Sequence, residues 1–308
     1  MCASEICFDT MPLPPSPTAA EFADAFPDVL DPQHIATGGF KYVYRALING
    51  RLEAFKLLAL PAAGANHAEQ AARQEYIGRA RREIELLSRC SANELVKLGS
   101  LSPRHATIRG IEFLAYSEEF LEGESIANYI RRGAPRPTEA IAKQLFVSLL
   151  KAIKQLWRFD TVHRDIKPLN VMMLSAPERP FVLLDLGIAY ETREPGLTQD
   201  PNVRMATLPY MAPEMLRPNF RQSLDYRADI YTAGITTFEF ATFTHPLQFR
   251  PEAPARTLTR VLRQAPLPLG SLRPDYSNEF CRLIDQTLKK SPPLRPSNID
   301  SIISHLEA

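Results

Sequence analysis

The stretch VHRDIKPLNVMML, residues 162–174, places an acid, a lysine and an amide within one short segment. Asp165 is followed two residues later by Lys167 and five residues later by Asn170, and a second acid, Asp185, ends the apolar run FVLLD. A hydroxyl that accepts a phosphoryl group needs a base, the moving phosphoryl group needs a cation, and Mg²⁺ prefers oxygen ligands. An isolated Asp or Asn in a loop is usually a turn residue. These residue types in this order indicate phosphoryl transfer to a hydroxyl.

Two runs with strand character precede this stretch. The runs KYVYRALI (residues 41–48) and RLEAFKLL (residues 51–58) are separated by Asn49-Gly50, which is a strong hairpin signal. Alternate residues of a strand share a face. The second run therefore groups four side chains on one face: Leu52, Ala54, Lys56 and Leu58.

A helix is expected over about residues 67–90, because apolar residues recur there at spacings of three and four. Its apolar stripe consists of Ile77, Ala80, Ile84 and Leu87. Glu83 borders this stripe, and an acid beside a core face usually needs a cation. Two shorter runs, around residues 95–98 and 111–120, have strand character.

Helices dominate from Thr138 onward. Thr138 is expected to cap the first of them, and another is expected over about residues 228–243. Strands followed by helices predict an α+β protein with a small sheet lobe and a larger helical lobe.

From about residue 33 to its end, the chain resembles the protein-kinase family, in particular soluble bacterial serine/threonine kinases of eukaryotic-like (Hanks) type. Residues 163–170 (HRDIKPLN) resemble the catalytic loop of the family, and residues 185–187 (DLG) its DFG motif. Residues 212–214 (APE) and 53–56 (EAFK) stand where APE and V-A-I-K are expected. The resemblance implies a two-lobed fold, with a β-rich N-lobe at residues 29–121 and a helical C-lobe at residues 122–308.

The resemblance also implies roles for the residues of the catalytic loop. Asp165 would accept the proton of the acceptor hydroxyl, and Lys167 would steady the transferred phosphate. Asn170 and Asp185 would hold Mg²⁺. A lysine at position 167 is the serine/threonine form of this loop, so the implied acceptor is a Ser or Thr hydroxyl of a protein substrate.

On the nucleotide side, Lys56 would bind the α- and β-phosphates of ATP and pair with Glu83. The glycine-rich loop is reduced to Gly38 and Gly39, whose backbone amides would approach phosphate closely. The adenine site implied by the resemblance is formed by Val43, Ala54, Glu119, Leu121 and Met172.

Glu118 departs from the family pattern, because that position usually carries an uncharged side chain at the back of the nucleotide pocket. A buried carboxylate there would need a cation or a raised pKa. It would either compete with Glu83 for Lys56, or be turned to solvent by a local bulge. We expect the bulge.

Structural pairs are implied in the helical lobe. Asp229 matches the buried acid that holds the catalytic-loop backbone, and Arg295 matches the arginine that pairs with Glu214. Thr207 matches a threonine that helps to seat the substrate. Arg164, next to Asp165, suggests regulation by phosphorylation of the segment before residue 214, with Thr198 as the favoured acceptor.

Two other functions are weighed against an active protein kinase. A pseudokinase scaffold or nucleotide-binding module is favoured by the departures at four positions: Ala36, Lys41, Glu118 and Leu186. A small-molecule phosphotransferase on the same fold ranks last, because the peptide-receiving segment with Thr207 and the APE motif is present.

Composition limits the remaining alternatives. Lys and Arg number 36 against 35 Asp and Glu, a balance that argues against a nucleic-acid binder. No apolar run approaches the ~18 residues that span a bilayer, and the four cysteines form no CxxC pair. The first residues show no basic segment followed by an apolar stretch, so we expect no secretory signal. We therefore expect a cytoplasmic protein that does not enter a membrane.

The N-terminal region is acidic, with six Asp and Glu and no Lys or Arg in residues 1–40. Its prolines at residues 12–17 disfavour helix and sheet. We expect residues 1–28 to form a mostly unpacked tail, through which a regulatory partner could bind. Phe22 and Phe26, four residues apart, could dock one helical turn on the domain.

Overall fold

The computed structural model describes residues 13–38, 41–62, 67–186, 190–191, 208–217, 220, 224–247 and 253–308. The chain divides into two compact units, one formed by the residues up to Gly78 together with Leu98–Phe120, the other by Arg79–Lys97 and Leu121–Ala308. The division after Phe120 lies one residue from the predicted lobe boundary. Residues 79–97 were expected in the first lobe, but they group with the second unit.

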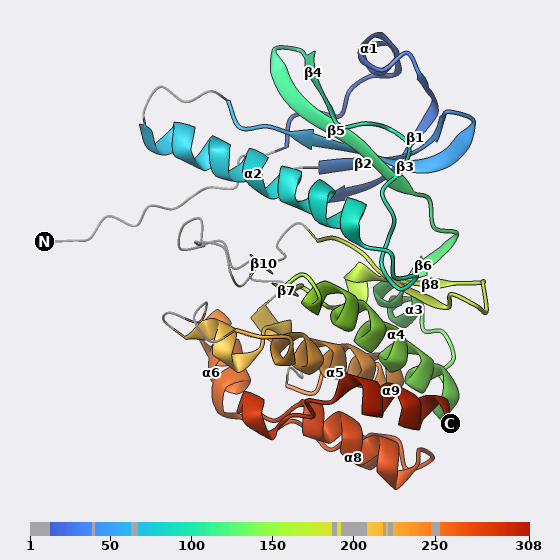
Figure 1. Cartoon of the computed structure of the whole chain (residues 1–308), viewed down its shortest axis with the longest axis vertical. Helices are drawn as coiled ribbons and strands as arrows, with labels where there is room; N and C mark the ends of the chain where they lie inside the picture. Colours follow the sequence, from blue (N-terminus) through green and yellow to red (C-terminus); the bar gives the residue numbers. More distant parts are fainter. Residues whose placement is uncertain are drawn as a thin grey trace, which may run out of the picture. The chain divides into compact units, whose positions relative to one another are not determined.

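The first unit is built on a five-stranded antiparallel sheet in the order β1-β2-β3-β5-β4 (Figure 1). Its strands are β1 (Val29–Gly38), β2 (Lys41–Ile48), β3 (Arg51–Ala59), β4 (Arg104–Ile108) and β5 (Ile111–Glu119). Asn49 and Gly50 both have positive φ, 51° and 74°, as the predicted two-residue hairpin turn requires. The hairpin is therefore confirmed.

The register of the sheet separates its two faces. Lys56 pairs with Val43 of β2 and with Tyr116 of β5, so these three side chains share one face. The opposite face carries a hydrophobic core formed by Tyr42, Tyr44, Ala46, Ile48, Phe55, Leu57, Ala59, Phe113 and Ala115. One face of the sheet is thus used for packing, and the other presents Lys56.

The expectation of an unpacked tail is wrong for residues 13–28. Thr18 caps helix α1 (Ala19–Ala25), and the helix seats two phenylalanines in the core described above. Phe22 and Phe26 are 2% and 0% exposed, with ring centroids 5.1 and 4.9 Å from that of Phe55. The docked helical turn is therefore confirmed, whereas residues 1–12 lie outside the described part of the chain.

Two acidic residues of this segment, Glu21 and Asp28, have basic partners from the β4–β5 hairpin. Glu21 accepts hydrogen bonds from Arg109, which lower the pKa of its carboxyl to about 2, and Asp28 pairs with Arg104 at 2.5 Å. The charge excess of residues 1–40 is thus partly matched within the first unit.

The second unit is mainly helical. Helix α2 (His67–Arg89) enters it from the first unit, and the other helices are α3 (Ile126–Arg131), α4 (Glu139–Trp157), α5 (Arg227–Thr242), α6 (Pro254–Arg263), α7 (Leu269–Leu272), α8 (Asn278–Thr287) and α9 (Ile299–Glu307). Short strands complete it: β6 (Gly123–Ser125), β7 (Thr161–Val162), β8 (Val171–Leu174), β9 (Phe181–Leu183) and β10 (Tyr190–Glu191). Thr138 caps α4 as expected, by accepting a hydrogen bond from the backbone of Ile141. The α+β fold class is confirmed.

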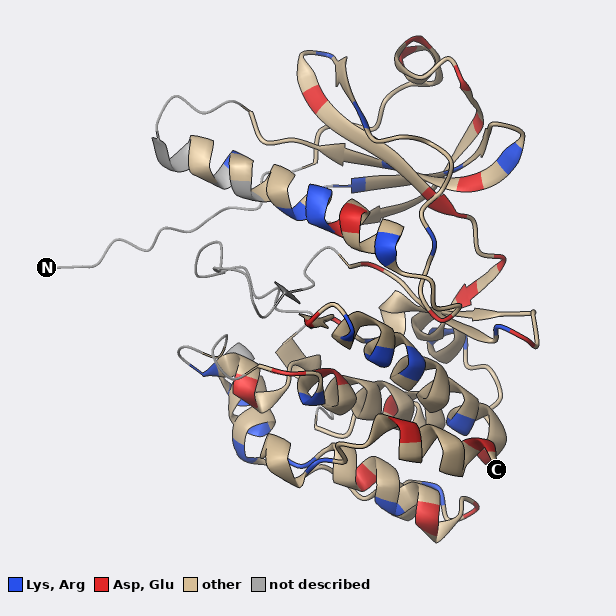
Figure 2. Cartoon of the chain, viewed as in Figure 1, with Lys and Arg blue, Asp and Glu red and all other residues tan. Residues whose placement is uncertain are grey.

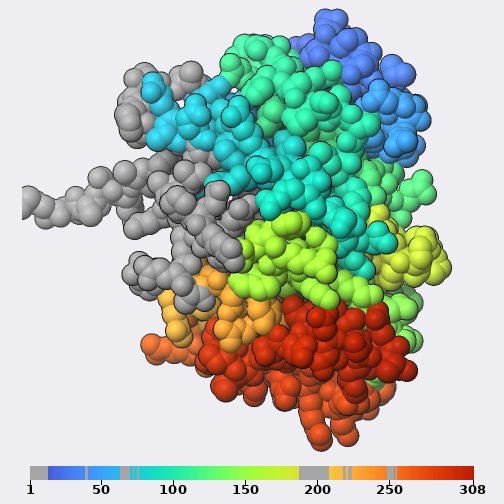
Figure 3. Space-filling model, viewed as in Figure 1, coloured from blue at the N-terminus to red at the C-terminus, as the bar shows by residue number. Residues whose placement is uncertain are grey.

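Helix α9 packs directly beside α4, as the space-filling view shows (Figure 3). Lysines of α4 face acids of α9, and Lys151 pairs with Glu307 at 2.6 Å while Lys154 pairs with Asp300. Lys and Arg are interspersed with Asp and Glu along the described helices of this unit (Figure 2).

The strand expected at residues 95–98 does not form. Leu95 and Leu98 make only single bridges, to Leu183 and to Glu118 respectively. Among the described helices, none combines the length and the apolar character that crossing a membrane would require.

We predict that Phe26→Ala selectively destabilises the first unit, by about 3–5 kcal/mol, because it leaves a cavity in the core. Hydrogen exchange followed by mass spectrometry should show faster exchange in β2 and β3. Asp24→Ala, an exposed change two residues earlier in helix α1, should leave the exchange unaltered. Equal protection in the two variants would mean that the Phe26 ring does not stabilise the core.

Candidate active site

The catalytic-loop candidate is anchored by the buried carboxylate of Asp229 in α5. Its oxygens accept hydrogen bonds from the backbone N–H groups of His163 and Arg164, at 2.7 and 2.9 Å. Asp229 is fully buried, and burial raises its pKa while the two hydrogen bonds act in the opposite direction. Arg164 adopts a positive φ of 70°, which the two fixed N–H groups hold in place.

The side chain of His163 joins this loop to the segment before Asp185. Its Nδ1 accepts a hydrogen bond from the backbone N–H of Asp165 at 3.2 Å. A neutral imidazole that accepts at Nδ1 carries its proton on Nε2, and Nε2 lies 3.1 Å from the carbonyl oxygen of Leu184. These two contacts therefore agree on a single tautomer.

Asp165, Lys167 and Asn170 are brought into direct contact. Lys167 Nζ lies 2.8 Å from both carboxylate oxygens of Asp165. Asn170 Nδ2 donates to the backbone oxygen of Asp165 at 2.8 Å and to its carboxylate at 2.9 Å. The carboxylate is therefore held between a cation and an amide, in an orientation that neither contact would fix alone.

Asp185 follows immediately on a residue that is tied to the same loop. The backbone N–H of Leu184 donates to the carbonyl of Asn170 at 2.8 Å, and the Leu184 carbonyl faces His163. Asp185 itself has a positive φ of 62°, an uncommon conformation for a residue other than glycine. The segment that carries Asp185 is thus hydrogen-bonded to the backbone of Asn170.

The residue types at this point suit Mg²⁺. No group of three or more His, Cys, Asp or Glu side chains that could hold a metal gathers in the described ranges. Mg²⁺ commonly takes only one or two protein oxygens, with water and phosphate oxygens completing its shell. Because the Asn170 amide nitrogen is used by Asp165, its carbonyl oxygen is the atom suited to a cation, together with the Asp185 carboxylate.

In the first unit, two of the predicted nucleotide residues share the face that presents Lys56. Val43 is paired with Lys56, and Ala54 precedes Lys56 by two residues on the same strand. Gly38 ends β1, and an added Cβ there would meet no atom within 4 Å. Gly39 lies outside the described residues, as does Thr198.

The bulge expected at Glu118 is absent. The pairing of β3 with β5 runs without interruption through Ala54 and Glu118, and Glu118 forms a buried ion pair with Lys56. Its carboxylate therefore lies on the same face as the lysine, so the expectation that it turns to solvent is wrong.

The other predicted nucleotide residues are distributed over both units. Glu83 is buried in α2, as its place beside the apolar stripe suggested, and its pairing with Lys56 stays a prediction. Glu119 ends β5 in the first unit, Leu121 begins the second stretch of the second unit, and Met172 lies in β8.

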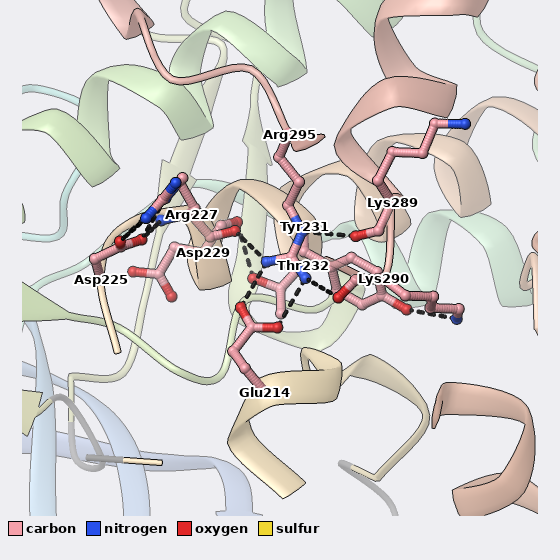
Figure 4. Close-up of polar contacts among 9 residues, drawn as sticks. All are labelled: Glu214, Asp225, Arg227, Asp229, Tyr231, Thr232, Lys289, Lys290 and Arg295. Carbon is pink, nitrogen blue, oxygen red and sulfur yellow. Dashed lines mark hydrogen bonds and ion pairs between the residues drawn. The ribbon is translucent and has the colours of Figure 1, made fainter. Parts of the chain in front are cut away.

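The predicted pair of Glu214 and Arg295 is present and buried (Figure 4). Two parallel hydrogen bonds of 2.5 and 2.7 Å join the guanidinium to the carboxylate. Its remaining N–H groups donate to the backbone oxygens of Lys289, Arg227 and Lys290. Thr207, predicted to help seat the substrate, lies outside the described residues.

A further polar group, which the sequence reasoning missed, lies beside the 3-10 turn at residues 208–210. Tyr210 donates a hydrogen bond to Glu239 of α5 at 2.7 Å, and its ring stands edge-on to His245 at 5.1 Å. Burial raises the pKa of Glu239 to about 7 and lowers that of His245 to about 3. An acid within the apolar run TTFEFATF was the available signal.

The comparisons with known proteins agree with this architecture. The family model described as protein kinase domain matches residues 31–306. The chain is 24% identical over 277 residues, 89% of its length, to a probable serine/threonine-protein kinase of Clostridium perfringens. It is 32% identical over 178 residues, 57% of its length, to a dual specificity mitogen-activated protein kinase kinase of Caenorhabditis elegans, and 30% identical over 198 residues, 62% of its length, to the serine/threonine-protein kinase pkn3 of Myxococcus xanthus.

The matched parts cover 37%, 48% and 35% of those three proteins, so the chain corresponds to less than half of each. The family match extends over nearly the whole chain. The chain therefore belongs to the protein kinase domain family.

We predict that Glu239 makes the stability of the second unit depend on pH. A carboxyl whose pKa is raised by folding stabilises the fold at low pH, and this contribution is lost as the pH rises from about 4.5 towards 7. Glu239→Gln mimics the protonated form at every pH. Its free energy of unfolding, relative to that of the original protein, should rise by roughly 2–3 kcal/mol between these two pH values.

Urea denaturation followed by the fluorescence of Trp157, the single tryptophan, measures this difference. His245 is present in both proteins, so its own titration cancels. Glu178→Gln, an exposed change, serves as the control. A stability difference that stays constant with pH would show that Glu239 is ionised at the same pH in the folded and unfolded states.

Proposed function

We propose that the chain is an active protein kinase that transfers the γ-phosphoryl group of MgATP to a Ser or Thr hydroxyl of a protein. The observation that carries the proposal is the direct contact of Asp165 with Lys167 and Asn170 on a loop anchored by Asp229. Phosphoryl transfer asks the protein mainly for positioning and charge stabilisation. A buried anchor that fixes the loop backbone supplies the positioning.

Asp165 is the residue proposed to orient the acceptor hydroxyl and accept its proton. Its two oxygens are shared between Lys167 and Asn170, so the carboxylate cannot rotate freely. Lys167 is proposed to contact the transferred phosphoryl group as well as Asp165, since an ammonium on a flexible stem can interact with two nearby anions.

Asn170 and Asp185 are the proposed magnesium ligands, supported by their oxygen donors and by the backbone link through Leu184. When bound, Mg²⁺ neutralises charge on the phosphate oxygens. The chain holds both residues on segments that are hydrogen-bonded to one another. Binding of Mg²⁺ would therefore cost little conformational entropy of the backbone.

The nucleotide-binding residues are proposed from the sheet face of the first unit and from Glu119, Leu121 and Met172. Val43 and Ala54 offer apolar contact for adenine, and Lys56 offers charge for the α- and β-phosphates. Gly38 allows close approach of the backbone to phosphate. Glu119 and Leu121 are proposed to act through backbone groups.

A pseudokinase remains the second candidate function, and one observation favours it. Lys56, the residue proposed to bind phosphate, is engaged by Glu118 in a buried ion pair. A lysine held in this way has less charge to offer a nucleotide. The transfer experiment below separates the two functions.

We predict that Asp165→Asn lowers the rate of phosphoryl transfer by about 10²–10⁴-fold, because it removes the proton acceptor while keeping the shape of the side chain. Nucleotide affinity should change little. Transfer from γ-labelled ATP to a generic protein acceptor gives the rate, and titration calorimetry gives the affinity.

Asp300→Asn is the matched control, since it makes the same change at an exposed site of the same unit. Full transfer by the Asp165 variant would refute the assigned role. Absence of transfer in the unaltered protein, with nucleotide still bound, would favour the pseudokinase.

We also predict that the transferred phosphate is found on Ser or Thr, with at most traces on Tyr. The basis is Lys167, which the family resemblance associates with serine/threonine kinases. Three acceptor peptides that differ only in a single Ser, Thr or Tyr, analysed by partial acid hydrolysis, measure the preference. Comparable amounts on Tyr would replace this assignment by dual specificity, the property named for the Caenorhabditis elegans relative.

A further inference from the structure

The buried ion pair of the first unit joins two charges that the family resemblance does not bring together. Lys56 Nζ of β3 contacts Glu118 Oε1 of β5, and the two side chains are only 6% and 4% exposed. Both residues lie on strands of one continuous sheet. Both partners of the pair therefore belong to the first unit.

The register explains why the two charges meet. Lys56 is directly opposite Tyr116, and Glu118 is two residues further along β5, so both side chains leave the sheet on the same face. The Lys56 ammonium also lies 5.4 Å from the centre of the Tyr116 ring. This is the face that carries Val43 and Ala54.

Removing two charges from water is costly, and the mutual attraction of the pair compensates only while both partners are present. A carboxylate and a phosphate offer the ammonium the same chemistry, namely an anionic oxygen acceptor. A phosphate that takes Lys56 must therefore replace its contact with Glu118.

We propose that Glu118 competes with nucleotide phosphates for Lys56 and thereby sets the affinity of the protein for ATP. This inference rests on the proposed function, in which Lys56 binds the α- and β-phosphates. Glu118 is a positioning residue in this scheme, since it acts on the nucleotide through Lys56. The effect of Glu118 on affinity must consequently be seen with ligands that carry phosphate and not with adenosine.

Glu118→Gln tests the proposal, because it removes the charge and keeps the shape of the side chain. Titration calorimetry in the presence of Mg²⁺ compares ATP, ADP and adenosine. The Kd for ATP and for ADP should fall about tenfold, at the lower end of the coupling found for close charge pairs, while the Kd for adenosine should not change. In steady-state kinetics the KM for ATP should fall by a similar factor, with a smaller change in kcat.

Glu112→Gln is the matched control. It makes the same chemical change on the same strand and the same face of β5, but at a half-exposed residue that pairs with Arg73. It should alter none of the three affinities.

A double variant tests whether the effect passes through Lys56. In a Lys56→Met background, Glu118→Gln should no longer tighten the binding of ATP relative to Lys56→Met alone. If Glu118→Gln folds poorly, Glu118→Met removes the same charge and places an apolar side chain in the sheet, with the same expected result.

Three outcomes would overturn the proposal: an unchanged affinity for ATP, an equal change for ATP and adenosine, or a gain that persists without Lys56. Failure of the proposed function is recognised differently, because then neither the original protein nor Glu118→Gln binds ATP. If Glu118→Gln binds ATP and the original protein does not, the result would support the proposal, with Glu118 excluding the nucleotide phosphates from Lys56.

Discussion

The candidate active site depends on one buried contact, in which the carboxylate of Asp229 accepts the backbone N–H groups of His163 and Arg164. Helix α5 can provide this anchor because its side chains are almost all buried, and Thr236 of the same helix also donates to the carbonyl of Ile166. The backbone is thus fixed on both sides of Asp165, which restricts the directions in which its side chain can point. Lys167 and Asn170 then complete the geometry with side-chain contacts. The order of the site thus derives from a core helix and not from the loop itself.

The first unit follows a different principle, the separation of two faces by strand alternation. Phe55 and Lys56 are neighbours in sequence, yet one packs in the aromatic core with Phe22 and Phe26 and the other forms the ion pair with Glu118. The N-terminal segment therefore stabilises the strand that presents Lys56 without occupying the face on which Lys56 lies. A slip of one residue in register would exchange these two environments.

The Glu214–Arg295 pair and the Asp229 anchor are long-range contacts, and the family resemblance implied both of them. The other features predicted successfully from the sequence are those with local signals. The Asn49-Gly50 turn, the Thr138 cap and the spacing of Asp165, Lys167 and Asn170 all lie within a few residues, where sequence distance limits spatial distance. The failures involve long-range pairing. The acidic composition of residues 1–28 favoured an unpacked tail. The packing of Phe22 and Phe26 was not foreseen in full, because their partner Phe55 is about 30 residues away in the sequence. The bulge at Glu118 was inferred from the cost of a buried carboxylate, whereas its cation comes from 62 residues earlier in the chain.

Two buried ion pairs in the described part of the chain, Lys56–Glu118 and Glu214–Arg295, differ in a way that bears on their roles. Arg295 uses all five of its N–H groups, two on Glu214 and three on backbone oxygens, so no ligand can gain a contact without breaking several. This pair fixes the junction between the APE segment and the helices after it (Figure 4). Lys56 carries a compact charge on a flexible stem and can exchange one anionic oxygen for another by rotating a few bonds. A rigid, saturated arginine suits a structural joint, and a single ammonium suits a site where the partner has to change. The chemistry of the two side chains therefore matches the separate roles that we infer for them.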